Sequence, residues 1–231
     1  MKIINQSHEI LTPDWEIKGM PILIELAGRT CYKSEDKITE TSADKFCRML
    51  IKKGHEAMIE HGNITVRFIT DRGVTHELVR HRLASFAQES TRYCNYGNKD
   101  MEFIRPVFDW GNVQSVSKDI QGNFDKKLRM FKTWKITMTV TEVAYQDMIK
   151  LGCSPQEARS VLPNSLKTEI IVTANIREWR HIFKLRTSIA AHPQIRKLMI
   201  PLLKELRTII PVLFDDIEAG KNPLHGERKK I

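Results

Sequence analysis

Apolar and polar residues recur along this chain with two periods, one typical of strands and the other of helices. Every second residue is apolar over residues 63–70, the clearest strand pattern covers 166–175, and weaker ones cover 1–6 and 101–108. A period of about 3.6 residues predicts helices at 21–31, 42–53, 124–151, 156–161, 177–188 and 193–210. This mixture predicts an α/β fold of the α+β type, with a central, mostly antiparallel sheet flanked by helices.

Two stretches between these elements need interpretation. Methionine and aromatic residues recur at helical spacing over residues 128–148, and we interpret this stripe as core packing and not as a cofactor site. Residues 109–122 are loop-like, and their pattern fits either a lid or a surface insertion.

Residues 75–93 carry the densest polar chemistry of the chain, with three arginines, two histidines, two acids and two serines. We expect a short helix with Thr75 as its N-cap, followed by a loop over residues 85–90. Guanidinium groups beside hydroxyls and a carboxylate suit a phosphate and the edge of a nucleobase or flavin. The alternative is a solvated basic helix, because runs of charge usually face water.

Composition limits the classes of protein to consider. The chain has 231 residues, 41% of them hydrophobic, and a net charge of +9, so a folded protein with anionic partners is expected. No apolar run reaches the roughly 18 residues that span a bilayer, and residues 1–5 do not resemble a signal peptide, so we expect a cytoplasmic location. We predict one domain over residues 1–220 and a basic C-terminal tail over 221–231.

Several common kinds of site are disfavoured. His55 and His61 are six residues apart and His76 and His81 five, so neither pair shares a helix face, and we expect no metal site. The glycine-rich phosphate motifs are missing, so arginines and helix ends would hold any nucleotide. A serine hydrolase is disfavoured because the chain lacks the G-x-S-x-G motif.

Four segments carry motifs whose order is informative. Arg80-His81-Arg82, seven residues and then Ser90 form the pattern R-H-R-x7-S. Residues 54–61, 158–163 and 173–186 carry the patterns G-H-E…E-H, A-R-x-x-L-P and T-x-N-x-R…L-R. Together they resemble the flavin-dependent thymidylate synthase family over residues 54–93 and 158–198, and four such matches in order are specific where one would be weak.

The resemblance implies a methyltransferase that converts dUMP to dTMP, with FAD as cofactor and with NADPH and methylenetetrahydrofolate as co-substrates. It also implies a homotetramer with sites at subunit interfaces, no obligate nucleic acid and no membrane. Two alternatives stay open. One is a related flavin-dependent C5-methylase or hydroxymethylase of another pyrimidine nucleotide such as UMP. The other is a basic nucleic-acid-binding module, which the net charge alone would fit.

The resemblance assigns roles residue by residue. Arg186 and His55 are implied to be catalytic, Arg186 by stabilising negative charge that develops on the uracil ring. The residues implied to bind FAD are Arg80, His81, Arg82, Gln88, Asn175, Arg177 and His181. The residues implied to bind dUMP are Glu77, Arg80, Gln88, Glu89, Ser90, Thr91, Arg92, Arg159 and Arg186. Taken alone, Arg159, Arg177 and Arg186 also fit ordinary surface arginines.

Three positions depart from the family pattern. Glu77 stands where the family usually has Gln, and Gln88 stands where it usually has Glu. Our hypothesis is that this reciprocal exchange keeps one amide and one carboxylate near the nucleotide. Ala57 replaces a frequent threonine, so one hydroxyl contact to the flavin is expected to be lost.

Overall fold

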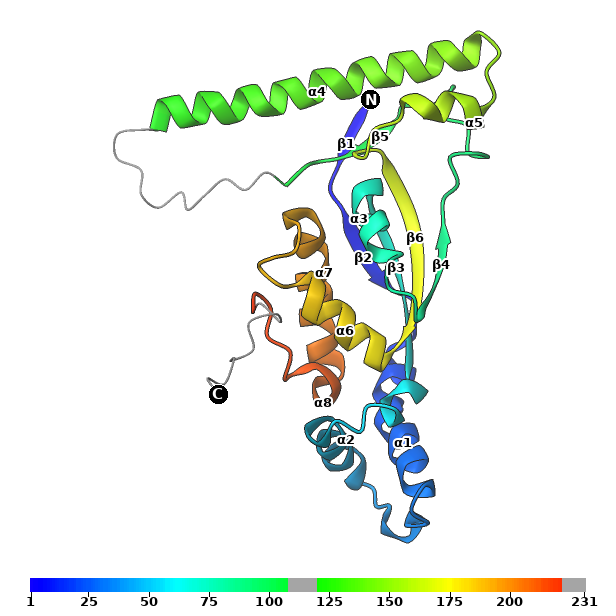
Figure 1. Ribbon diagram of the computed structural model, residues 1–231, viewed down its shortest axis with the longest axis vertical. Coiled ribbons are helices and arrows are strands. Elements are labelled where there is room, and N and C mark those ends of the chain that lie inside the picture. The colour runs from blue at the N-terminus through cyan, green and yellow to red at the C-terminus, as the bar shows by residue number, and fades with distance from the viewer. Residues whose placement is uncertain (108–119, 222–231) are drawn as a thin grey trace, which may run out of the picture. The chain divides into compact units, whose positions relative to one another are not determined.

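The computed structural model describes residues 1–107 and 120–221, except for the side chains of residues 120–125 and 127 (Figure 1). The predicted loop over 109–122 and the predicted tail over 221–231 lie almost entirely outside these residues. The chain forms two compact units. The first unit consists of Met1–Gln6, Ile69–Thr75 and Gln88–Glu169, and the second of Ser7–Phe68, His76–Ala87 and the chain from Ile170 onward. The single domain over 1–220 stays a prediction.

A four-stranded sheet has the strand order β2-β3-β6-β4. Its strands are β2 (Ser7–Ile10), β3 (Asn63–Asp71), β6 (Lys167–Asn175) and β4 (Ala84–Gln88). Every second residue of β3 and β6 is buried, because one face of each strand packs on a core, and this confirms the alternation in the sequence. The expected loop over 85–90 is wrong over its first four residues, because residues 84–88 form an edge strand. The single large apolar residue of this strand, Phe86, gives too weak an alternation to detect in the sequence.

The polar segment after β3 forms helix α3 (Arg72–Leu78) and then a turn that contains His81. Thr75 lies inside this helix, so its expected role as N-cap is wrong. Asp71 caps the helix instead, because its Oδ1 accepts the backbone N–H of Val74 at 2.8 Å. The helix therefore begins and ends earlier than predicted, and the Arg-His-Arg motif projects from a turn.

The first unit contains β1 (Lys2–Ile4), β5 (Glu102–Ile104), α4 (Ile120–Lys150), α5 (Pro155–Ala158) and η3 (Arg159–Val161). Strands β1 and β5 pair in parallel. Helix α4 buries Met138 and Tyr145 beside Phe103, which confirms a core role for this part of the stripe. Leu128 is 40% exposed, so the core interpretation is wrong at that position within this chain.

The second unit contains the helices α1 (Asp14–Thr30), η1 (Glu35–Lys37), α2 (Ser42–Lys53), η2 (Met58–His61), α6 (Ile176–Arg186), α7 (Pro193–Ile209) and α8 (Pro211–Phe214). Trp179 is fully buried and stacks on Phe183. Helix α2 has the predicted bounds and ends at Gly54, whose φ of 72° favours glycine. Helix α1 begins seven residues before the predicted start at Pro21, because acidic residues in its first turn favour a helix there.

The described chain combines helices with an antiparallel sheet, and this confirms the predicted α/β fold class. Among the described helices, none is both long enough and apolar enough to span a bilayer.

Candidate active site

Three segments of the second unit meet around one guanidinium group. Helix α6 follows β6 directly, and Asn175 caps it by accepting the backbone N–H of Glu178 at 2.8 Å. The last turn of α6 carries Arg186, where the helix dipole favours a cation. The end of α3 and the turn after it bring Glu77 and His81 to this arginine. Residues more than 100 positions apart in the sequence thus form one polar cluster.

The guanidinium group of Arg186 makes three hydrogen bonds, one from each nitrogen. Its Nε donates to Nε2 of His81 at 3.1 Å, and its terminal nitrogens donate to Oε2 and the backbone oxygen of Glu77 at 2.9 and 3.1 Å. Arginine has five N–H donors, so one hydrogen on each terminal nitrogen has no partner among the described residues. The side chain is 20% exposed. The group is held in place and keeps two donors for a planar ligand.

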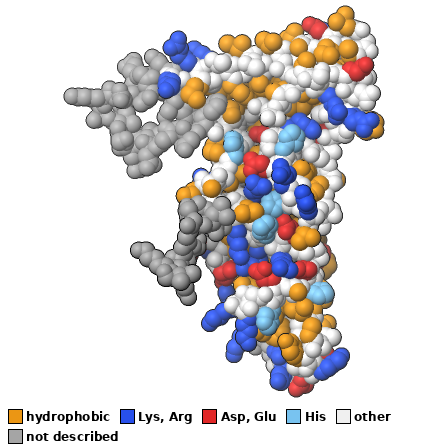
Figure 2. Space-filling model, viewed as in Figure 1, with side chains coloured by type: hydrophobic (Ala, Val, Ile, Leu, Met, Phe, Trp, Pro, Cys, Tyr) orange, Lys and Arg blue, Asp and Glu red, His pale blue; other side chains and the backbone are white. Residues whose placement is uncertain are grey.

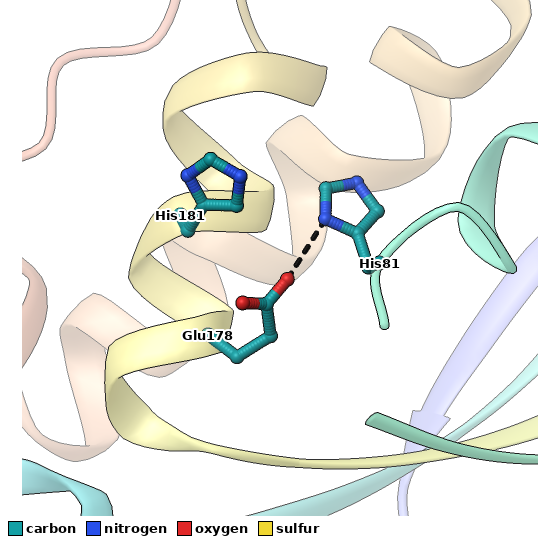
Figure 3. A group of neighbouring side chains, drawn as sticks. All are labelled: His81, Glu178 and His181. Atoms are coloured by element: carbon teal, nitrogen blue, oxygen red, sulfur yellow. Dashed lines mark hydrogen bonds and ion pairs between the residues drawn. The ribbon is translucent and has the colours of Figure 1, made fainter. Parts of the chain in front are cut away.

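His81 supports this guanidinium from a buried position. Its Nε2 must accept, because arginine offers only donors, so the ring proton lies on Nδ1. That proton is donated to Oε1 of Glu178, 2.9 Å away (Figure 3). Burial is the largest influence on the pKa of His81 and lowers it, and the charges of Arg186 and His181 lower it further, against the opposing bond to Glu178. The ring is therefore neutral near pH 7, with one defined tautomer.

The same histidine belongs to a group with the spacing of metal ligands. Nitrogen or oxygen atoms of His81, Glu178 and His181 all lie within 4.8 Å of one another (Figure 3). One nitrogen of His81 faces the cation Arg186, and the other carries a proton toward Glu178. A metal ion would have to displace one of them. These bonds favour a hydrogen-bond network at this place, and the expected lack of a metal stays a prediction.

Other residues assigned to FAD surround this cluster. Arg80 and Arg82 are exposed in the turn on either side of His81. The ring of His181 meets that of His81 edge-on, with centroids 5.6 Å apart. Asn175 lies at the base of α6, where its side-chain oxygen is used as the cap. The second unit therefore offers exposed cations and a histidine around one network.

Arg177 is held separately, by two acids of the segment after α2. Its Nη1 donates to Glu60 at 2.6 Å, and its Nε lies 3.4 Å from Glu56. The hydrogen bond to Glu60 is the largest cause that raises the pKa of Arg177. The side chain is 48% exposed, so a ligand phosphate can compete with these carboxylates for it.

His55 follows the left-handed Gly54 and lines a cavity of about 680 Å³ in the second unit. Phe46, Met49 and Met58 supply apolar walls, and Lys53 lies at the same cavity. Ala57 also lines it, so the methyl side chain stands where the family pattern has a hydroxyl. A partly apolar cavity with a few polar groups suits a flat aromatic ligand.

In the first unit, the side chains of Gln88 and Glu89 contact other side chains of the protein. The amide of Gln88 donates to the hydroxyls of Thr75 and Thr168 at 3.0 and 3.2 Å. Both of its N–H groups are used, which leaves its oxygen as the atom available to a ligand. Glu89 accepts the hydroxyl of Tyr96 at 2.7 Å and lies 3.2 Å from Lys167. Burial first, and then this bond, raise the pKa of Tyr96.

The remaining residues assigned to dUMP also belong to the first unit. Ser90 Oγ accepts the backbone N–H of Arg92 at 3.3 Å, and the Arg92 guanidinium lies over the ring of Tyr93. Thr91 is buried, and Arg159 is exposed at the start of η3. The gathering of these arginines with Arg80 and Arg186 around one ligand stays a prediction, because the two units are described separately.

Glu178 is a residue of this polar cluster that sequence reasoning missed. It follows Asn175 by three residues, and the pattern Asn-x-x-Glu is an ordinary sign of a helix start. Only the fold shows that its buried carboxylate reaches the distant His81.

Comparisons with known proteins show the family to which the chain belongs. A family model described as "Thymidylate synthase complementing protein" matches residues 16–212. A flavin-dependent thymidylate synthase of Mycobacteroides abscessus is 33% identical over 95% of this chain and 90% of its own length. Another from Corynebacterium glutamicum is 32% identical over 88% and 82%.

Solved structures share the fold. The UMP/dUMP methylase PolB of Streptomyces cacaoi, bound with 5-Br dUMP, matches with a TM-score of 0.74 and 22% identity over 93% of this chain and 96% of PolB. The thymidylate synthase ThyX of Helicobacter pylori, with FAD and dUMP, matches with a TM-score of 0.69 and 19% identity over 92% and 98%. The family model and the curated relatives place the chain in a class of nucleotide-modifying flavoproteins. Within this class, the chain belongs to the family of flavin-dependent thymidylate synthases.

Proposed function

We propose that this protein catalyses the reductive methylation of dUMP, in which dUMP, methylenetetrahydrofolate, NADPH and a proton give dTMP, tetrahydrofolate and NADP⁺. The observation that carries the proposal is the guanidinium of Arg186, fixed by Glu77 and His81 and keeping two open N–H donors. Membership of the family supplies the reaction class.

The reaction places a specific demand on the protein. Carbon C5 of uracil is a poor nucleophile until negative charge builds on the ring oxygen and nitrogen atoms. A guanidinium whose donors already point outward stabilises that charge without reorganising, which is the main source of electrostatic catalysis. Arg186 meets this demand, because three bonds to the protein fix its orientation before the substrate arrives.

The donor set of the second unit fits FAD. Arg80, Arg82 and Arg177 are exposed cations suited to a pyrophosphate, and His181 offers an exposed ring beside them. Bound FAD supplies the hydride that completes the methyl group. The protein residues hold the flavin, and His81 keeps a neutral ring next to Arg186.

For dUMP, we assign the phosphate and sugar to the first unit. Arg92 and Arg159 supply cations, and Ser90 with Thr91 supplies hydroxyl and backbone donors. Gln88 presents its amide oxygen, because both N–H groups are bound to threonines. We place folate in the cavity beside His55, whose apolar walls suit a pterin ring.

Assembly as a homotetramer belongs to the same proposal, as does a cytoplasmic location. Large apolar side chains are exposed on two helices, including Trp15 and Ile22 on α1 and Ile136 and Val140 on α4. Exposed apolar patches of this kind are usually covered by a partner.

The visible spectrum of the purified protein tests the proposal. We expect a flavin spectrum that NADPH bleaches, and reoxidation with methylenetetrahydrofolate and dUMP that yields dTMP. Release of tritium from C5-labelled dUMP, compared with labelled UMP, separates dUMP from the alternative substrate. Faster tritium release from UMP would show that UMP is the substrate instead of dUMP, and the class of enzyme would stay the same.

A nucleic-acid-binding module is the alternative of another class. It would present a basic stripe, whereas Figure 2 shows Lys and Arg side chains interspersed with Asp, Glu and His over the face in view. A protein that purifies colourless, takes up no FAD and binds oligonucleotides with a steep salt dependence would support this alternative instead.

A further inference from the structure

Glu178 is a buried acid without a role in the proposed reaction. Its side chain is 7% exposed, and an unpaired carboxylate at such a place would be costly. Its oxygen Oε1 accepts from Nδ1 of His81 at 2.9 Å, and Figure 3 shows this pair facing each other from α6 and the turn after α3. The cap of α6 does not need this carboxylate, because Asn175 already accepts the backbone N–H of Glu178.

The bonds of this network have one possible direction. Arg186 Nε can only donate, so Nε2 of His81 accepts, Nδ1 carries the proton and the carboxylate of Glu178 accepts that proton. Removing the carboxylate frees the proton to move to Nε2. An N–H on Nε2 would then face the N–H of Arg186, and two donors cannot bond.

We infer that Glu178 is a positioning residue for Arg186, acting through the tautomer of His81. This inference rests on the proposed role of Arg186 toward dUMP. Glu77 holds the terminal nitrogens of Arg186 directly, and Glu178 secures the third nitrogen through the histidine. Two acids on different elements thus fix one guanidinium.

Glu178 sets the tautomer of His81 and not its charge. The groups that face this ring are Glu178, Arg186 and His181 from α6, with Glu77 beyond Arg186 on α3. Burial, Arg186 and His181 all lower the pKa of His81, and the bond to Glu178 opposes them. Loss of Glu178 therefore lowers this pKa further, and the ring stays neutral while its proton becomes free to change place.

The tautomer can be measured directly by solid-state ¹⁵N NMR of histidine-labelled holoenzyme, with the signal of His81 identified by its loss in His81→Gln. We expect a protonated Nδ1 and an unprotonated Nε2. A proton on Nε2 in the unmodified protein would overturn the inference. This measurement needs no catalytic activity, so it determines which nitrogen of His81 carries the proton even if the proposed reaction is wrong.

Two variants then test the consequence for Arg186. Glu178→Leu removes the acceptor at similar volume, and we expect a mixed His81 tautomer and a Kd for dUMP raised about tenfold. Glu178→Gln keeps one acceptor oxygen and should restore part of the affinity. Should Glu178→Leu fail to fold, Glu178→Gln and the unmodified protein still supply the tautomer and the affinity.

Glu205→Leu is the matched control, because Glu205 also contacts a histidine, His8, at 2.7 Å but at an exposed place. It should change neither the tautomer of His81 nor the affinity for dUMP. A Glu178 with a purely structural role would lower the melting temperature of its variants while leaving tautomer and affinity as they are, and that result would contradict the inference. The inference would also be contradicted if Glu178→Leu changed the tautomer of His81 but bound dUMP with the affinity of the unmodified protein.

Discussion

Helix α6 carries two arginines whose surroundings differ in an instructive way. Arg180 is 2% exposed and forms a bidentate pair with Asp216 at 2.6 and 2.7 Å, while also donating to the backbone oxygen of Leu213. Its Nε is buried without a partner among the described residues. Arg186, six residues later, is one-fifth exposed and keeps a free hydrogen on each terminal nitrogen.

The difference separates a structural arginine from one available to a ligand. Arg180 is buried and joins α6 to α8 and to the segment after it, and three of its four terminal N–H donors bond protein acceptors. Arg186 uses one donor per nitrogen to fix its plane, and the rest point to no protein group in the described chain. A site for a planar anion requires that second arrangement.

The largest effect is expected from Arg186→Lys. A lysine keeps the charge but loses the planar set of donors, so kcat/KM for dUMP should fall by about 10²- to 10³-fold. The melting temperature should change little, because the side chain is partly exposed. Steady-state kinetics with calorimetry measure both, and Arg48→Lys, at an exposed ion pair, is the control.

Arg180→Met should show the opposite pattern. It removes the buried partner of Asp216, and we expect the free energy of unfolding to fall by about 3 kcal/mol. This is near the lower end for buried pairs, because Asp216 is 44% exposed. Urea unfolding measures the loss, while the affinity of the folded protein for dUMP should be unchanged. If Arg180→Met greatly weakened dUMP binding without lowering stability, the assignment of Arg180 as structural and Arg186 as available to a ligand would be wrong.

Sequence reasoning could find most of the fold but not this distinction. Strand β6 and helix α2 were predictable because burial imposes its period on the residues. Nothing local separates Arg180 from Arg186, since their acceptors lie on Asp216 and Glu77, far away in the sequence. Family motifs predicted that Arg186 is a site residue. They did not identify Glu178, whose pattern equally signals a helix start.

Acid should affect the two arginine sites in different pH ranges. The pKa of His81 in the folded protein lies below its ordinary value of 6.5. As the pH drops below 6.5, the unfolded chain therefore binds a proton at this histidine before the folded chain does, and the folded state loses stability. The pKa of Asp216 lies below 3.8: burial raises it, but Arg180 outweighs burial, so its contribution is lost only below 3.8.

Urea unfolding as a function of pH checks these ranges. His81→Gln should flatten the profile near pH 6, and Arg180→Met should flatten it below pH 4, with both variants otherwise following the unmodified protein. Identical profiles for the two variants would contradict the assignment.

The smallest effect is expected from Glu77→Gln. The amide oxygen still accepts from Arg186, but a bond to a neutral acceptor is weaker, and we expect the Kd for dUMP to rise about fivefold. Under the hypothesis of a reciprocal exchange, Gln88→Glu in the same chain restores part of this loss. A double-mutant cycle measures the coupling, and strict additivity would argue against it.

The most direct test of the role of Arg186 is a crystal structure of the holoenzyme with dUMP. The account predicts both terminal nitrogens of Arg186 within hydrogen-bond distance of the uracil ring, with its bonds to His81 and Glu77 preserved. A uracil ring bound elsewhere, or an Arg186 that faces only protein and water in the complex, would contradict it.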